Sequence, residues 1–235
     1  MANSASALGS LVNIIVDPKK ALTDIRGHNG WLWYPLLTVV LVGVVMQLWY
    51  LHSVDFNWLV DQTLASKAAD MTADQLRTAR ERMTPGSFNL FAVVGTVVFI
   101  PVWYLVQALY FFMTAKLGGY QEQSYGSWLS FISWTSFVGI LGFVASAAFL
   151  ATSGSRQVSP VAIDITSLNT LLFHVAYAQK GQALLSSLRL TSFWSWALMV
   201  VGLAQWTGKS LGRSALIVLL PYAIGYAIWA LIAFL

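Results

Sequence analysis

Cysteine is absent from the 235 residues, and charged side chains are scarce. Without a thiol the chain can form no disulfide, no thiolate nucleophile and no cysteine-ligated zinc site. Only 9% of the residues are Asp, Glu, Lys or Arg, whereas a soluble globular domain carries about 25%. So few charges cannot cover a folded chain with a solvated surface, and 57% of the residues are apolar or aromatic. The composition therefore predicts a membrane protein.

The basic residues are also dispersed. Thirteen Lys and Arg give a formal net charge of +4, but they nowhere form a run of five. A nucleic-acid-binding protein gathers such residues on one face, so we expect no nucleic-acid partner. Mild basicity suits short segments that touch anionic head groups, which makes membrane lipids the expected partners. A protein partner or a homo-oligomer is left open.

Five apolar runs are each long enough for a transmembrane helix, which needs roughly 20 apolar residues to cross the hydrocarbon core. Trp and Tyr residues stand at the edges of the first and third runs, where amphipathic rings are favoured. The runs are centred on Trp31–Leu51, Phe91–Met113, Leu129–Ala151, the stretch between Arg189 and Lys209, and Ser214–Leu235. We therefore expect an all-α, polytopic membrane protein with a five-transmembrane-helix bundle over residues 31–235.

The segments outside these runs are expected to be short helices or loops. Residues 1–30 lack the pattern of a signal peptide, and their apolar residues recur at helical spacing on both sides of Pro18. This predicts an N-terminal amphipathic segment at the membrane surface. The polar loop 52–87 contains the capping box Thr72-Ala-Asp-Gln75, which predicts a short helix over 72–83. The stretch 164–180 is too short for a span and is expected to be a surface-lying or re-entrant helix.

No group of residues predicts catalysis. The three histidines fall in separate segments without metal-binding spacing, so no metal site is expected. No Gly-x-Ser-x-Gly elbow occurs, and no lysine lies inside a span to act as a base. We therefore expect no catalytic residue, no cofactor and no enzymatic activity.

Three glutamines, Gln47, Gln107 and Gln205, are the candidate intramembrane polar residues. The central parts of the five runs hold no Asp, Glu or Lys, which disfavours a proton-driven transporter. Amides at such positions most often bond to a neighbouring helix. The alternative is that they line the path of a channel or transporter for a small solute.

Small residues recur along the third and fourth runs at helical spacing. In lipid, helices associate by close packing, which small side chains permit. We therefore expect these residues to face neighbouring helices in a compact bundle. The candidate helix-packing residues on the third run are Thr135, Gly139, Gly142 and Ser146. On the fourth run they are Ser195 and Gly202, which share a helical face with Ser192.

Basic flanks indicate the orientation. Lys19 and Lys20 precede the first run, while Lys209 and Arg213 lie between the fourth and fifth. With five spans all four share one side, which the positive-inside rule makes cytoplasmic. We therefore expect a cytoplasmic N-terminus and an external C-terminus.

Several motifs resemble bacterial members of the Yip family, the Rab/Ypt-interacting type of membrane protein. They are the stretch Asn13–Ile25 with Trp33-Tyr-Pro-Leu36, the element Met71–Gln75, and Phe193–Leu203 followed by Gly208-Lys-Ser210. The resemblance extends from about Leu8 to the C-terminus. The sequence departs from the pattern at Trp134–Val138, which lacks the proline expected early in the third span.

The resemblance implies five spans, a cytoplasmic N-terminus, a bacterial inner membrane location and no enzymatic activity. It supplies no catalytic residues, and Rab binding belongs to eukaryotic relatives with longer N-termini. The function it implies is that of a non-enzymatic membrane organiser or adaptor, in membrane trafficking or lipid organisation.

Overall fold

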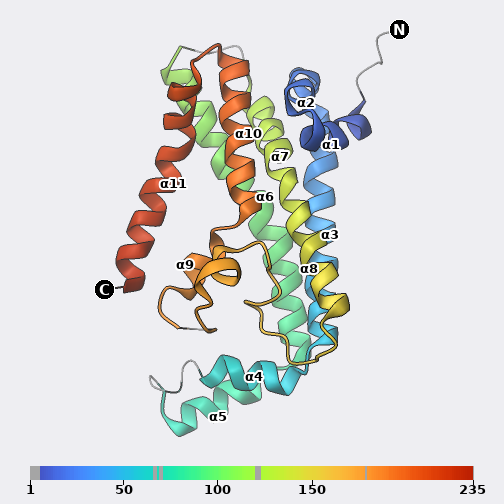
Figure 1. The fold of residues 1–235 in the computed structure, drawn as a ribbon, viewed down its shortest axis with the longest axis vertical. Coiled ribbons are helices and arrows are strands. Elements are labelled where there is room, and N and C mark those ends of the chain that lie inside the picture. The colour runs from blue at the N-terminus through green and yellow to red at the C-terminus, as the bar shows by residue number, and fades with distance from the viewer. Residues whose placement is uncertain (1–5, 66–67, 69–70, 120–122, 178, 235) are drawn as a thin grey trace. The chain divides into compact units, whose positions relative to one another are not determined.

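The computed structural model describes residues 6–65, 68, 71–119, 123–177 and 179–234, which form helices and turns but no strand. The all-α class is therefore confirmed. The helices, labelled in Figure 1 where there is room, are α1 (Ala7–Val16), α2 (Pro18–Ile25), η1 (Asn29–Leu32), α3 (Trp33–Ser53), α4 (Phe56–Ala65), α5 (Ala73–Arg82), α6 (Pro85–Leu117), α7 (Tyr125–Ser136), η2 (Phe137–Gly139), α8 (Ile140–Thr152), η3 (Asn169–Phe173), α9 (Gln182–Ser187), α10 (Leu190–Thr207) and α11 (Leu211–Phe234).

Four helical segments of the described chain are long and apolar enough to cross a membrane. They are Asn29–Ser53, Pro85–Leu117, Tyr125–Thr152 and Leu211–Phe234, and they coincide with the first, second, third and fifth predicted runs. The chain is thus a membrane protein. The fourth run forms α10, which is not among the four, because its serines, threonines, glutamine and tryptophans lower its mean hydropathy. Four of the five predicted spans therefore coincide with helical segments that can cross a membrane.

The chain divides into two packed units. The first comprises Met1–Leu41, Val98–Ile140 and Thr191–Ala227, and the second comprises Val42–Val97, Leu141–Leu190 and Ile228–Leu235. Helices α3, α6 and α11 contribute residues to both units. Each unit is described separately below.

An aromatic cluster forms the core of the first unit. Trp128 and Phe131 of α7 are fully buried, and both contact Trp206 of α10, with ring centroids 5.7 Å and 5.0 Å from it. Phe111 of α6 completes the cluster, 5.6 Å from Phe131. Aromatic pairs at these separations contribute about 0.5–1.5 kcal/mol each beyond the area they bury. The cluster therefore holds α6, α7 and α10 together.

The second unit has its own apolar core around the end of α3. Its buried residues are Tyr50, Val54, Leu59, Leu150 and Val158. The Tyr50 hydroxyl donates to the Val158 carbonyl at 2.8 Å and ties α3 to the loop that follows α8. Helices α4 and α5 lie side by side (Figure 1) and are joined by an ion pair between Arg80 and Asp61.

The capping box in the polar loop is formed in both directions. The Gln75 amide N–H donates to Thr72 Oγ1 at 3.3 Å, and the Thr72 N–H donates to Gln75 Oε1 at 2.8 Å. Helix α5 accordingly begins at Ala73 and ends at Arg82.

The segment 164–180 forms no long helix within its described residues. It contains only the π-helical turn η3, followed by His174 in the left-handed region. The ends of the loop are fastened together instead: Asp164 pairs with Arg189 at 2.5 Å, and the Leu168 N–H donates to the Leu188 carbonyl at 2.7 Å. Polar side chains in this stretch bond to nearby backbone and so compete with a continuous helix.

Candidate functional site

Each of the three predicted glutamines hydrogen-bonds to a residue of its own unit. Gln205 of α10 donates to Thr23 Oγ1 at 2.6 Å and to the Lys19 carbonyl at 3.2 Å, both on α2. Gln107 of α6 accepts from the Tyr222 hydroxyl of α11. Gln47 of α3 donates to Thr96 Oγ1 of α6 at 2.7 Å. Each amide thus links two helices, and none of these bonds joins one glutamine to another.

The predicted packing residues differ in how closely neighbours approach them. Gly202 of α10 is the tightest, since a Cβ built there would lie 2.5 Å from the Phe131 ring. On the third run, Thr135 is buried and donates to the Phe131 carbonyl at 2.8 Å, whereas a Cβ at Gly139 would meet no atom within 4 Å. Gly142 is half-buried, and Ser146 and Ser195 are buried.

A 3₁₀ turn changes the geometry of the predicted stripe on the third run. Helix η2 covers Phe137–Gly139 between α7 and α8. Such a turn winds 3.0 residues per turn instead of 3.6, so the i, i+4, i+7 register is not kept through it. Thr135 therefore lies on an α-helical face of α7 that ends before Gly139.

Within the first unit, the N-terminal helix pair is docked on α10 through the end of α2. The last four carbonyls of a helix lack partners within it. Here the indole N–H of Trp206 donates to the Leu22 carbonyl at 2.9 Å. The His28 ring N–H donates to the Asp24 carbonyl, and the His28 backbone N–H donates to the Ile25 carbonyl. The Arg26 N–H donates to Thr23. All four carbonyls are thus bonded, one of them by the side chain from α10.

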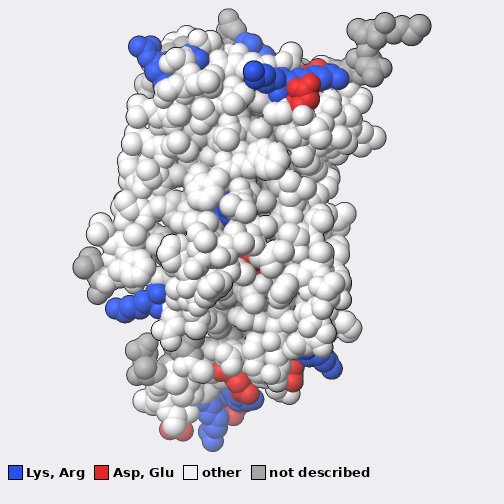
Figure 2. All heavy atoms as spheres, in the orientation of Figure 1, with Lys and Arg blue, Asp and Glu red and all other residues white. Residues whose placement is uncertain are grey.

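The docked pair exposes an apolar row beside basic residues. Leu8, Val12 and Val16 of α1 recur every four residues and are 69%, 60% and 70% exposed. Lys19 and Lys20 on α2 are exposed as well. In Figure 2, basic and acidic side chains lie together where Figure 1 places α1 and α2. The row and the lysines together resemble the surface of an interfacial helix.

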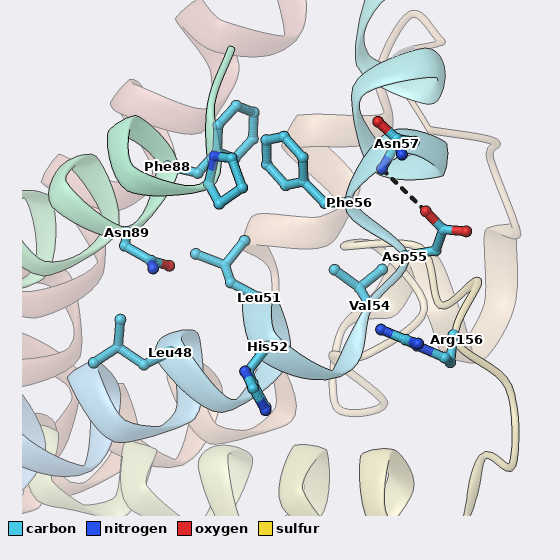
Figure 3. Close-up of a pocket in the computed structure, with 11 residues that line it drawn as sticks. Leu48, Leu51, His52, Val54, Asp55, Phe56, Asn57, Phe88, Asn89 and Arg156 are labelled. Carbon is cyan, nitrogen blue, oxygen red and sulfur yellow. Dashed lines mark hydrogen bonds between the residues drawn. The ribbon is translucent and has the colours of Figure 1, made fainter.

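The second unit contains a cavity of about 680 Å³ at the end of α3 (Figure 3). Its apolar wall comes from Leu48, Leu51, Val54, Phe56, Pro85 and Phe88, and its polar lining from His52, Asp55, Asn57, Asn89 and Arg156. Phe56 and Phe88 meet edge to face at 5.3 Å. The Asp55 carboxylate begins α4 by accepting from the N–H groups of Asn57 and Trp58, at 3.0 Å and 3.2 Å.

Sequence reasoning missed two residues that the structure brings forward. Trp206 stands beside Gln205 at the end of a predicted span, and its bond to α2 has no signal in the local sequence. Arg156 lies in a Ser- and Gly-rich loop with no motif around it. No three His, Asp or Glu residues come together as a metal site in the part of the chain that the structure describes.

The comparison with protein families decides the classification. The Yip1 domain matches residues 12–232, nearly the whole chain. The chain belongs to the Yip1 family. No curated protein and no solved structure matches it. The Yip1 match confirms the family resemblance of the sequence motifs and covers parts of both packed units, from the second half of α1 through α2 and the membrane helices.

Proposed function

We propose that this Yip1 family protein is a non-enzymatic organiser of the membrane that acts through its docked N-terminal helix pair. The observation that carries the proposal is the exposed row Leu8, Val12 and Val16 beside Lys19 and Lys20. An apolar helix face buried in the head-group region, next to basic side chains, binds anionic lipid surfaces. Because α2 is fixed to α10 by Trp206 and Gln205, the protein presents this surface at a set position.

The proposed topology has five spans, with α10 as the fourth. Its 18 residues reach about 27 Å, close to the hydrocarbon thickness. A helix that buries Leu198, Met199 and Leu203 within the first unit needs a less apolar surface than one that faces lipid on all sides. All four basic flanking residues then lie on one side of the membrane: Lys19, Lys20, Lys209 and Arg213. We assign this side to the cytoplasm of a bacterial cell, which places the C-terminus outside.

The alternative function, a channel or transporter for a small solute, requires polar side chains free to line a path. The bonds of Gln47, Gln107 and Gln205 to neighbouring helices favour the organiser. Reconstituted vesicles should therefore show no solute flux above that of protein-free vesicles. Reproducible flux that Gln107→Leu abolishes, with the fold intact, would favour the transporter.

Site-specific labelling tests the lipid surface, because the chain has no native cysteine. An environment-sensitive fluorophore on Val12→Cys should report an apolar setting in vesicles of phosphatidylcholine with phosphatidylglycerol. It should also transfer energy to labelled phosphatidylglycerol more efficiently than random mixing gives. A label on Ala73→Cys, an exposed position of α5, is the matched control and should report water.

The double variant Lys19→Gln, Lys20→Gln should lose the enrichment of phosphatidylglycerol while the Val12 label stays buried. A Val12 label in water in both phosphatidylcholine and mixed vesicles would overturn the proposed function.

A further inference from the structure

We propose that the cavity of the second unit binds the anionic head group of a single membrane phospholipid. This site is separate from the lipid surface of α1 and α2 and does not depend on it. The cavity lies where α3 ends at Ser53 and α6 begins at Pro85, and both helices belong to apolar segments that can cross a membrane. Ends of transmembrane helices lie at the level of the head groups.

Arg156 gives one side of the cavity a positive charge, which favours an anion there. Arg156 reaches from the loop after α8 across Val54 toward the end of α3, and His52 lies on the same side (Figure 3). Within the described residues the Arg156 guanidinium has no ion pair. The backbone of Arg156 is held in place because the Arg156 carbonyl accepts from the Asp55 N–H at 2.7 Å. A guanidinium binds phosphate oxygens through two parallel hydrogen bonds.

The acidic residue of the cavity, Asp55, is engaged at the start of α4. One oxygen of Asp55 accepts from the first N–H groups of α4, and the carboxylate is turned toward Asn57 (Figure 3). On the other side of the cavity, the Asn89 amide supplies a further donor. The polar lining therefore includes a guanidinium, an imidazole and an amide, each of which can donate to a phosphate oxygen.

The apolar wall makes the ligand a lipid and not free phosphate. Leu48, Leu51, Phe56 and Phe88 are among the six apolar residues of the lining. Beyond Asn89, the α6 residues Leu90, Phe91 and Val94 are 62%, 75% and 49% exposed, and they continue an apolar surface along which an acyl chain can lie. A cavity of about 680 Å³ holds the glycerophosphate portion of such a lipid.

Ligand-induced thermal stabilisation tests the site. The full-length protein in a non-ionic detergent is titrated with dihexanoyl phosphatidylglycerol, with dihexanoyl phosphatidylcholine, and with inorganic phosphate. We expect a saturable rise in the unfolding temperature with the phosphatidylglycerol and a weaker effect with the phosphatidylcholine. Inorganic phosphate should give none at matched concentration. An equal effect of phosphate would overturn the lipid assignment, and equal affinity for both lipids would overturn the charge argument.

Two variants separate the site from general lipid binding. Arg156→Gln should weaken the affinity for dihexanoyl phosphatidylglycerol roughly tenfold or more, the usual effect of losing a charged hydrogen bond. Asn89→Phe, at an exposed position, should block the cavity by volume. Arg77→Gln is the matched control, because Arg77 is an exposed arginine of the same unit paired with Glu81 on α5, and it should bind as the wild type does.

Unchanged affinity in both Arg156→Gln and Asn89→Phe would overturn the proposal. Loss of affinity in Lys19→Gln, Lys20→Gln with both cavity variants unaffected would place the binding on the N-terminal surface instead. The two lipid sites can therefore fail independently.

Discussion

Gly202 is the residue at which α10 comes closest to its neighbours. A Cβ there would lie 2.5 Å from Phe131 Cε2 and 3.0 Å from Leu22 Cδ2. The Phe131 ring is fully buried between other rings and cannot move aside freely. We therefore expect Gly202→Ala to reduce the free energy of unfolding by about 1–3 kcal/mol, as overpacking does in other cores. The measurement is the thermal unfolding midpoint in detergent.

Gly225→Ala is the control for this prediction. Gly225 lies within α11 of the same unit, and a Cβ there would meet no atom within 4 Å. Its midpoint should equal or slightly exceed that of the wild type, because alanine is the better helix former by about 1 kcal/mol. Equal midpoints for Gly202→Ala and Gly225→Ala would show that α10 does not depend on close approach at Gly202.

At Ser133 of α7 we expect a substitution to stabilise the protein. Its hydroxyl is buried and has no hydrogen-bond partner among the described residues, and an unpaired buried hydroxyl costs about 1–3 kcal/mol. Ser133→Ala should therefore raise the free energy of unfolding by about 1 kcal/mol. Thr135→Val, two residues along the same helix, removes a hydroxyl that donates to Phe131 and should bring no gain. A lower midpoint for Ser133→Ala than for the wild type would contradict this reasoning.

At the scale of elements, the sequence predicted those helices whose signals are local. The apolar runs placed α3, α6, the α7–α8 segment and α11, because hydropathy over twenty residues is a property of the run itself. The capping box is also a local signal, since its bonds join Thr72 to Gln75, and α5 begins at the next residue, Ala73. Periodicity around Pro18 indicated the segment that forms α1 and α2, which meet at Asp17.

Elements that depend on distant contacts could not be predicted in this way. The turn η2 interrupts a run that hydropathy treats as one helix. The segment 164–180 is shaped by the pair Asp164–Arg189, whose members lie far apart in sequence. At the candidate sites the sequence selected Gln205 by its residue type, but not its bond to Thr23. Arg156 had no signal, because only folding brings the loop after α8 to the end of α3.

The docking of α2 on α10 gives a prediction at this scale. Trp206→Phe keeps an aromatic ring in the cluster but leaves the Leu22 carbonyl without its donor, which should weaken docking by about 1 kcal/mol. The reporter is Ser10→Cys on α1, because Ser10 is only 1% exposed and a buried thiol reacts when the pair detaches. Its reaction with a maleimide in detergent should be roughly fivefold faster in the Trp206→Phe background.

The control for docking is Val12→Cys. Val12 is exposed in the docked state, so its thiol should react at the same rate whether or not the Trp206→Phe substitution is present. If the Ser10→Cys rate is unchanged by Trp206→Phe, the indole does not hold the helix pair.

At the scale of the whole molecule, the number of spans decides on which side each surface acts. Four segments are long and apolar enough to cross, and the proposed fifth, α10, is less apolar. If α10 crosses, the loop before it and the link to α11 lie on opposite sides of the membrane. If it does not, both lie on the same side, and the C-terminus returns to the side of the N-terminus. The placement of Lys209 and Arg213 with Lys19 and Lys20 depends on this point alone.

A cysteine scan of intact cells tests the crossing, because the parent chain holds no thiol of its own. Lys180→Cys before α10 and Ser210→Cys after it are each treated with a membrane-impermeant maleimide. We expect Lys180→Cys to react in intact cells and Ser210→Cys only after lysis, since five spans and the positive-inside rule place residue 210 in the cytoplasm. A reporter active only in the cytoplasm, fused after Leu235, should stay inactive. Reaction of both cysteines from outside, or an active reporter, would mean that α10 does not cross, and the basic residues of the α10–α11 link would then lie across the membrane from those of α2.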